Sequence, residues 1–478
     1  MNERLQKARE QFLMNPLLNA RAISESCGLA PDEIRSVFVQ IQNDAVIQKR
    51  LDSWGPGCGY CIRVMSDVLQ ASECIQAIYN HQPVYPSVLE LHTGPLCPCA
   101  CIFCYSKGEA TLNTDCSRYC PGAGAQKLTS AQILSAVFAF VDHGCKAIYF
   151  SGGLEPFSSK TTVDVFRHLP AEPCVRVYTN GVPDILTHDV LEMVVARASQ
   201  LRFSIHAATP QTYAVVQMPH RSDGQQIFEE VKRRVKEALQ IRRHLLDAGK
   251  PAAQIGVTFL TVPANYQEIE QAVMMWAEAG LDFFDIGNDA LANDSRTNPL
   301  TPQQRDQLHE SFQRLNVFSE SGKLGNMRLR PSRESVQKFL KPDAGICYAP
   351  LLKAVIDPFG TRWACCMRAH PALQHGKFRV NHVTSGEDIT RFAEQHAAAP
   401  QTLQEIPLPW HCRECTEFEY AANICMKKIL DDLAFGIKLS EQPFASNART
   451  SAQQSVFQTE RPAIGVSTMG RQHEELLR

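Results

Sequence analysis

The chain has 478 residues, of which 44% are apolar, and a formal net charge of -2 with a sequence pI of about 6.7. This length exceeds what one compact core usually holds, so we expect two or three structural units. The near-neutral balance gives no reason to expect a nucleic acid or an anionic membrane surface as partner. No run approaches the roughly 18–20 apolar residues of a membrane helix, and the first residues lack the apolar stretch of a signal peptide, so a cytoplasmic location is expected.

The 18 cysteines are the unusual part of the composition. In a long chain kept reduced by cytosolic thiol buffers, clustered cysteines bind metals or iron-sulfur centres more often than they form disulfides. The spacing of the grouped cysteines therefore decides what they do.

Residues 1–85 carry helical patterning, with apolar side chains recurring at helix-like intervals between Ala20 and Ile41 and a turn at 28–31. This predicts a small helical region at the N-terminus. The stretch also resembles a helix-turn-helix loosely, but its second helix lacks the basic face that DNA binding requires.

From 86 to 335, apolar strands alternate with amphipathic helices. The strands are predicted at 87–92, 147–153, 174–180, 201–207, 255–263 and 283–288, and helices at 130–144, 223–249 and 265–280. Strands separated by helices of this length imply right-handed crossovers and a parallel sheet. We therefore expect an α/β fold, a full or partial barrel of six units, with its chemistry on the loops after the carboxyl ends of the strands.

The first such loop contains Cys97, Cys101 and Cys104 in a C-x3-C-x2-C spacing, with Phe103 before the last cysteine. This motif resembles the radical S-adenosylmethionine (SAM) superfamily, which implies a [4Fe-4S] cluster held by three cysteines and an open fourth iron that binds SAM. Three thiolates on one loop suit soft iron, and the missing ligand leaves the open position. Cys99 is expected to be a spectator. A zinc site would need a fourth ligand, which is not evident here.

The loop after the second strand reads SGGLEP and contains Gly152, Gly153 and Glu155. It resembles the glycine-glycine-glutamate motif of radical SAM proteins, where backbone and carboxylate hold the methionine ammonium. Glycines permit close backbone approach, and a carboxylate attracts an ammonium. Placed one strand after the cysteine motif, this second motif strengthens the resemblance.

Further strand ends supply Thr179, Asn180, Ser204 and His206. In relatives, such positions contact the ribose or the carboxylate of SAM. The alternative is that each polar side chain only satisfies the local backbone.

Two polar loops add further candidates. The guanidinium of Arg221 suits a bidentate carboxylate contact. Asp285, Asn288 and Asp289 follow the last predicted strand, where they could bind substrate hydroxyls or amines, with a solvated loop as the alternative.

A third region, 336–437, contains Cys347, Cys365, Cys412 and Cys415, with a hairpin predicted to turn at 357–360. The spacing resembles the twitch extension, half of a SPASM domain, and implies a second, auxiliary [4Fe-4S] cluster that transfers electrons. A structural four-cysteine zinc site is the alternative. The roles of four other cysteines stay open: Cys116, Cys120, Cys366 and Cys425. Residues 438–478 are predicted to form a tail.

The motifs at 85–104, 147–156 and 177–180 look like those of radical SAM aminosugar deaminases of the kind found in desosamine biosynthesis, and the C-terminal cysteines resemble those of aminocyclitol dehydrogenases of the butirosin kind. The resemblance implies a small aminosugar, nucleotide-sugar or aminocyclitol substrate from secondary metabolism, and a flavodoxin- or ferredoxin-type reductant. Oxidation of the substrate is favoured if the second cluster exists. Elimination or deoxygenation, a peptide-modifying maturase and a non-catalytic iron-sulfur regulator are the alternatives.

Overall fold

The computed structural model describes the chain in separate stretches: 3–14, 18–43, 68–69, 71–104, 126–151, 154–288, 300–330, 347–363, 366, 379–382 and 417–442. The helices and strands of the molecule are described within these residues.

One mixed sheet of ten strands forms the centre of the molecule, in the order β10-β9-β8-β1-β2-β3-β4-β5-β6-β7. Neighbouring strands are parallel from β8 to β7, whereas β9 is antiparallel to both β8 and β10. The strands are β1 (Val88–Leu91), β2 (Ala147–Phe150), β3 (Cys174–Thr179), β4 (Gln200–Ser204), β5 (Gln254–Thr261), β6 (Phe283–Asn288), β7 (Arg328–Arg330), β8 (Lys353–Ile356), β9 (Thr361–Trp363) and β10 (Arg379–His382).

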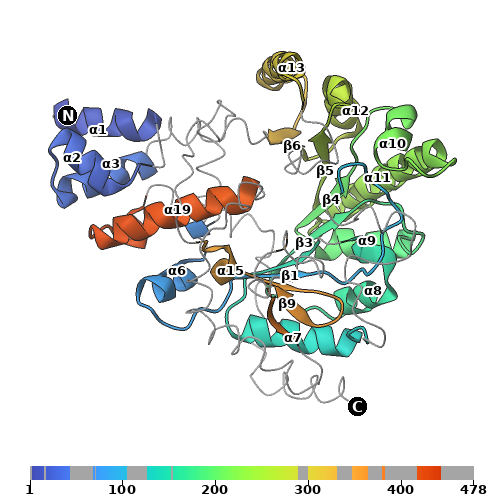
Figure 1. The fold of residues 1–478 in the computed structure, drawn as a ribbon, viewed down its shortest axis with the longest axis horizontal. Coiled ribbons are helices and arrows are strands. Elements are labelled where there is room, and N and C mark those ends of the chain that lie inside the picture. The colour runs from blue at the N-terminus through green and yellow to red at the C-terminus, as the bar shows by residue number, and fades with distance from the viewer. Residues whose placement is uncertain are drawn as a thin grey trace.

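Crossover helices lie along one side of this sheet (Figure 1). They are α7 (Ser130–Asp142), α8 (Lys160–Arg167), α9 (His188–Arg197), α10 (Pro210–Val216), α11 (Gly224–Asp247), α12 (Ile269–Ala279) and α13 (Pro302–Glu320), with short 3-10 helices at η2 (Pro156–Ser158) and η3 (Tyr266–Glu268). Local sequence fixes several ends. Thr129 and Gln132 form a capping box that starts α7, and Gly280 ends α12 with φ of +85°.

A helical unit combines segments from the N-terminal and C-terminal parts of the described residues. It contains α1 (Glu3–Met14), α2 (Ala20–Cys27), α3 (Pro31–Asn43), α6 (Ser72–Tyr79), α15 (Ala349–Leu352), α19 (Glu417–Ala434) and the 3-10 helix η7 (Leu439–Glu441). Their buried side chains form one apolar cluster that combines N-terminal and C-terminal residues. Within it, the buried Lys428 pairs with the buried Asp432, which also accepts a hydrogen bond from the backbone of Ala20.

The predicted strands and helices agree with this architecture. All six predicted strands are present, as β1 to β6, and the fold is mixed α/β with a mostly parallel sheet. The hairpin predicted to turn at 357–360 is formed by β8 and β9. Its first strand pairs with β1, so the hairpin extends the main sheet. The described strands leave β10 and β7 as the two edges of the sheet, and closure into a barrel stays a prediction. In the described part of the chain, no helix is long and apolar enough to cross a membrane.

Candidate active site

The cysteine loop leaves the carboxyl end of β1 and is held against the end of α10. The backbone N–H groups of Ala100 and Ile102 donate to the carbonyl oxygens of Gln217 (2.9 Å) and Val216 (3.0 Å). The three motif cysteines, Cys97, Cys101 and Cys104, are half-buried on this loop, which brings all three to one edge of the sheet.

Gln217 joins this loop to the end of β4. Its side chain accepts a hydrogen bond from the backbone of His206 at 2.7 Å and donates to the carbonyl oxygen of Ser204 at 3.1 Å. Gln217 is buried, and its local sequence gave no signal of this role because a polar residue at a helix end is ordinarily solvated.

Glu155 braces the ends of β2 and β3. One carboxylate oxygen accepts from the Thr179 hydroxyl at 2.7 Å and from the backbone of Phe157 at 3.1 Å, and the other accepts from the backbone of Asn180 at 2.7 Å. A carboxylate offers about four acceptor positions, so about one is left. Burial raises the pKa of Glu155 to about 8, against the lowering effect of the hydrogen bonds from Asn180 and Thr179.

The backbone of Glu155 is in turn packed against the cysteine loop. Its N–H donates to the carbonyl oxygen of Leu96 at 3.0 Å. A Cβ atom at Gly94 would lie 1.7 Å from the carbonyl oxygen of Glu155, so only glycine fits there. The two motifs are therefore in backbone contact.

Asn180 contacts both the cysteine motif and the Glu155 motif. Its backbone bonds Glu155, and its side-chain amide donates to the sulfur of Cys97 at 3.4 Å. This amide-to-thiol contact fixes the position of the first motif cysteine relative to the carboxylate.

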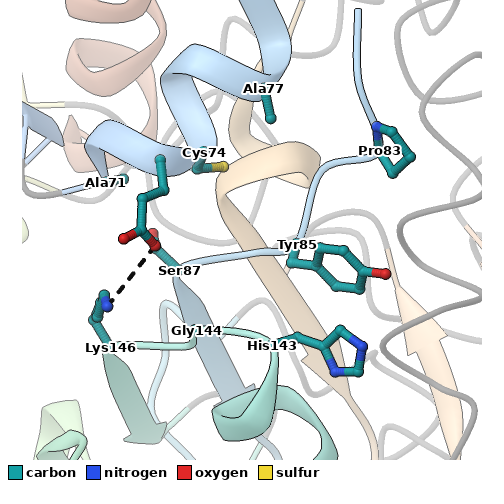
Figure 2. Close-up of a pocket in the computed structure, with 10 residues that line it drawn as sticks. Ala71, Cys74, Ala77, Pro83, Tyr85, Ser87, His143, Gly144 and Lys146 are labelled. Carbon is teal, nitrogen blue, oxygen red and sulfur yellow. Dashed lines mark ion pairs between the residues drawn. The ribbon is translucent and has the colours of Figure 1, made fainter.

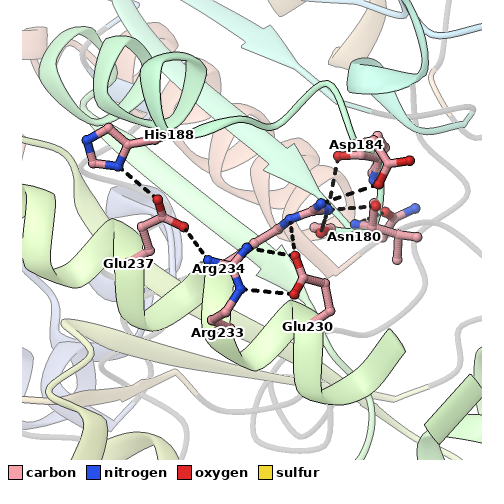
Figure 3. A network of polar contacts seen from close by, with 10 residues as sticks. Asn180, Asp184, His188, Glu230, Arg233, Arg234 and Glu237 are labelled. Atoms are coloured by element: carbon pink, nitrogen blue, oxygen red, sulfur yellow. Dashed lines mark hydrogen bonds and ion pairs between the residues drawn. The ribbon is translucent and has the colours of Figure 1, made fainter. Parts of the chain in front are cut away.

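The loop that carries Asn180 is held by Arg234 of α11 (Figure 3). The buried guanidinium donates to three successive carbonyl oxygens, those of Gly181, Val182 and Pro183, at 2.8, 2.6 and 3.0 Å. Gly181 has φ of +74°, which favours glycine at this turn. Arg234 thus positions the Asn180 loop, a role that no motif indicated.

Phe103 lies over His206 at the other side of the cysteine loop. The two rings meet edge to face with centroids 4.8 Å apart. The Nδ1 atom of His206 accepts from the backbone of Leu260 at 2.9 Å, so the neutral ring carries its proton on Nε2. Burial lowers the pKa of His206 to about 3, and Arg202 adds to the shift.

The thiols of the loop fit an iron-sulfur cluster by their chemistry. Cys99 is buried, and hydrogen bonds with the Cys101 and Cys97 thiols, together with burial, raise its pKa well above its ordinary value. Three thiols thus lie side by side, and Cys104 follows within the same turn, with its N–H bonded to the carbonyl of Cys101 at 3.0 Å. In the described stretches, however, no three His, Cys, Asp or Glu side chains are arranged as a metal site.

Other predicted site residues have different surroundings. Gly152 and Gly153 lie outside the described residues. Ser204 is half-buried at the end of β4, where its carbonyl holds Gln217. Arg221 is exposed and its guanidinium makes two hydrogen bonds to Asp223, at 2.8 and 2.7 Å. Its contact with SAM stays a prediction.

Of the predicted auxiliary ligands, only Cys347 lies in the described residues; Cys365, Cys412 and Cys415 lie outside them. Cys347 is half-buried and its sulfur accepts a hydrogen bond from the Asn423 amide at 3.4 Å. Two cysteines to which the sequence assigns no role are buried. Cys366 accepts a hydrogen bond from the Lys353 ammonium at 3.3 Å, and Cys425 lies in the helical unit. Cys116 and Cys120 lie outside the described residues.

A cavity of about 160 Å³ lies at the opposite, amino-terminal ends of the strands (Figure 2). Ser87 and Lys146, which precede β1 and β2, line it, and the ring of Tyr85 stacks on that of His143 there. Because the motif loops follow the carboxyl ends of these strands, this cavity is separate from the candidate site.

No family model matches the chain, and no curated protein matches it. Among solved structures, SuiB of Streptococcus suis bound to precursor peptide SuiA matches with a TM-score of 0.49 and 13% identity, covering 72% of each chain. Native anSMEcpe with bound AdoMet matches with a TM-score of 0.44 and 12% identity over 77% of this chain and 99% of that chain. BtrN with AdoMet and 2-DOIA matches with a TM-score of 0.28 and 10% identity over 67% and 87%. Likeness at these scores carries no conclusion about activity, which must come from the residues.

Proposed function

We propose that this chain is a radical SAM enzyme in which Cys97, Cys101 and Cys104 hold a [4Fe-4S] cluster whose fourth iron binds SAM. One observation carries the proposal. Asn180 bonds the Cys97 thiol with its side chain and the Glu155 carboxylate with its backbone. Loops at the carboxyl ends of adjacent parallel strands are where α/β enzymes gather their ligand-binding groups.

When bound, the cluster and SAM supply a 5′-deoxyadenosyl radical that removes a hydrogen atom from the substrate. The protein itself orients SAM and the substrate and excludes water from the site. Phe103, Val216 and Val262 form a small apolar cluster with Cys101 packed against it, which shields that side of the loop from water.

The proposed SAM contacts follow the resemblance. Glu155, with Gly152 and Gly153, receives the methionine ammonium through its remaining acceptor position. The side chains proposed to contact the ribose or the carboxylate of SAM are Thr179, Asn180, Ser204 and Arg221.

We further propose that Cys347, Cys365, Cys412 and Cys415, in a domain at 336–437, hold a second cluster. That would favour dehydrogenation of a hydroxyl-bearing carbon in an aminosugar, nucleotide-sugar or aminocyclitol, because loss of a hydrogen atom, then of an electron and a proton, is a two-electron oxidation. The electrons for SAM cleavage would come from a flavodoxin or ferredoxin. Elimination and deoxygenation are the competing outcomes if the C-terminal thiols bind no cluster, whereas peptide modification is a competing outcome that would share the second cluster.

The test is iron and sulfide per chain after anaerobic reconstitution, for the native protein and for a variant with Cys97, Cys101 and Cys104 replaced by Ala. About eight irons falling to about four indicates two clusters, and about four falling to none indicates one. Cys145→Ala, which removes a buried thiol bonded to the backbone of Ala147, is the matched control.

A second readout concerns the chemistry itself. Native protein with dithionite and SAM should release 5′-deoxyadenosine, and Cys101→Ala should release none. Unchanged iron content in the triple variant, or product from Cys101→Ala, would contradict the proposal.

A further inference from the structure

Tyr213 of α10 lies beside the buried side of the cysteine loop. Its carbonyl oxygen accepts from the backbone N–H of Gln217 at 2.8 Å, and the carbonyl oxygen of Gln217 in turn accepts from the N–H of Ala100 at 2.9 Å. Cys99 precedes Ala100, and Cys99 and Tyr213 are both buried in the main apolar core. Only one helical turn, a rise of about 5.4 Å, therefore separates Tyr213 from the point where α10 holds this loop.

The hydroxyl of Tyr213 is a buried donor that lacks a well-formed hydrogen bond. Within the described residues, it has no hydrogen-bond partner of good geometry. The ring itself is packed, with its centroid 5.2 Å from that of Phe228. A phenylalanine would pack in the same way without burying a polar group, and a buried polar group without a partner lowers stability. The surroundings of this hydroxyl must therefore explain it.

The hydroxyl faces the thiols of the cysteine loop. Burial is the largest cause that raises the pKa of Tyr213 well above its ordinary value. The other causes are the charges of the Cys99, Cys101 and Cys97 thiols, and hydrogen bonding to the Cys99 thiol at a geometry short of a well-formed bond. Of the three thiols Cys99 has the largest effect, so it lies nearest to the hydroxyl.

Cys99 in turn contacts two of the proposed cluster ligands. It is 2% exposed, and its thiol is hydrogen-bonded with the thiols of Cys101 and Cys97. A thiol is a weak donor and a weak acceptor at once, so the Cys99 sulfur can accept from the Tyr213 hydroxyl while its S–H donates elsewhere. The three groups thus form a chain that begins at Tyr213, passes through Cys99 and ends on the sulfur of a ligand.

A bound cluster would give this chain a direction. The ligand sulfurs would then be thiolates, which accept hydrogen bonds and have no proton to donate. The S–H of Cys99, which lies between the ligands in sequence, would point toward one of them. Hydrogen bonds to the sulfurs of an iron-sulfur cluster stabilise its more negative, reduced state and so raise its reduction potential.

We propose that Tyr213 is a positioning residue for reduction of the cluster: its hydroxyl donates to the Cys99 sulfur, the Cys99 S–H donates to the sulfur of Cys97 or Cys101, and this relay raises the reduction potential. The inference rests on the proposed function, because the relay needs a cluster on these cysteines. It assigns a role to Cys99, which the motif spacing alone leaves as a spectator. Neither the hydroxyl nor the Cys99 thiol gives up its proton.

The experiment is an anaerobic redox titration of the reconstituted protein, followed by electron paramagnetic resonance. The part of the spectrum that added SAM alters belongs to the cluster with the open iron, so a second cluster does not interfere. We expect a more negative potential than native in Tyr213→Phe and in Cys99→Ala, both with native iron content. Cys99→Ser keeps an O–H donor and should lie closer to native than Cys99→Ala. The double variant should shift no further than Cys99→Ala, because Tyr213 acts through Cys99.

Tyr266→Phe is the matched control, since it removes a buried hydroxyl that bonds Gln307 at 2.7 Å, and it should keep the native potential. Urea unfolding of the iron-free protein separates the relay from packing. Tyr213→Phe should lose no stability there, because its hydroxyl has no well-formed bond, whereas Tyr266→Phe should lose some.

Four results would overturn the relay: a native potential in Tyr213→Phe, a further shift in the double variant, loss of iron from Cys99→Ala, or equal losses of stability in the two Phe variants. The proposed function is judged separately by iron content and 5′-deoxyadenosine. A loaded cluster with an unshifted potential would refute only the relay, and a loaded native protein that releases no 5′-deoxyadenosine would refute only the function. Native protein that binds no iron would refute both.

Discussion

The side-chain amide of Asn180 donates a hydrogen bond to the sulfur of Cys97 at 3.4 Å. The same residue bonds Glu155 through its backbone, so a substitution of its side chain leaves the contact with the carboxylate in place. Asn180→Ala should therefore weaken SAM binding by about 1–2 kcal/mol, roughly five- to thirtyfold, because it removes the hydrogen bond to the Cys97 sulfur and the one that the amide oxygen accepts from the backbone of Val182 at 2.9 Å. Asn180→Asp should be worse, because it adds a like charge beside the sulfur. Equilibrium SAM binding and iron content of both variants check this. Equal SAM affinity and iron content in the Ala and Asp variants would contradict the predicted effect of the added negative charge.

The contact between Gly94 and Glu155 predicts a steric effect. In Gly94→Ala the new Cβ would lie 1.7 Å from the carbonyl oxygen of Glu155, which forces the two motif loops apart. Such overpacking costs about 1–3 kcal/mol or more. Gly249→Ala is the control, because Gly249 has φ of +68° but open space around it, and the left-handed backbone alone costs about 1–2 kcal/mol. Urea unfolding gives both values, and only Gly94→Ala should also lower iron content.

Arg234 and its neighbour Arg233 offer a matched pair. Arg234→Met removes the donor of three carbonyl bonds, one of them buried and two partly buried, so we expect a loss of about 2–4 kcal/mol in the free energy of unfolding. Arg233 is exposed and pairs with Glu230 and Glu237 on the same helix, so Arg233→Met should cost about 1 kcal/mol or less. SAM affinity should fall only in the Arg234 variant, because only that residue positions the Asn180 loop. Equal losses in both variants would argue against this role.

His206 predicts a pH dependence of stability. Its pKa is lowered to about 3 by burial in the folded state, whereas an unfolded histidine has a pKa near 6.5. The unfolded chain therefore binds a proton between pH 6.5 and 3 that the folded chain does not, and stability falls as the pH falls through this window. From pH 7.5 to 5.5, native protein should lose about 1.4 kcal/mol more than His206→Gln. The exposed His168→Gln serves as control, and parallel pH curves for native protein and His206→Gln would contradict the assignment.

The helical unit contains a buried ion pair whose disruption should be costly. Lys428 lies 5.8 Å from the Phe12 ring centroid and 5.3 Å from that of Phe38, and it bonds Asp432. Lys428→Met leaves a buried carboxylate without its cation, for which about 3–5 kcal/mol is expected. Lys7→Met, at an exposed position on α1 of the same unit, should cost well under 1 kcal/mol. Urea unfolding of the two variants measures the difference.

Local sequence patterns predict most of the strands and helices, but few of the side-chain contacts that hold the loops of the candidate site. Strands such as 174–180 and 255–263 were recognisable because both have apolar runs of strand length between helical segments. The cysteine spacing and Glu155 were recognisable because their chemistry depends on short intervals in the chain. Gln217 and Arg234 were not, since each acts on backbone atoms brought near only by folding. The pairing of β8 with β1 was missed for the same reason, because no periodicity within either strand identifies its neighbour.

That pairing bears on the order in which the protein matures. The Ser87 hydroxyl, just before β1, bonds the carbonyl of Leu352, a partner 265 residues later in the chain. During synthesis at about 5–20 residues per second, the strand that bears the cysteine loop waits on the order of tens of seconds for its neighbour. Cys97, Cys101 and Cys104 are thus synthesised long before the strand that pairs with β1, beside which their loop folds. Cofactor loading should consequently follow the synthesis of β8, and nascent chains halted before β8 should retain little iron.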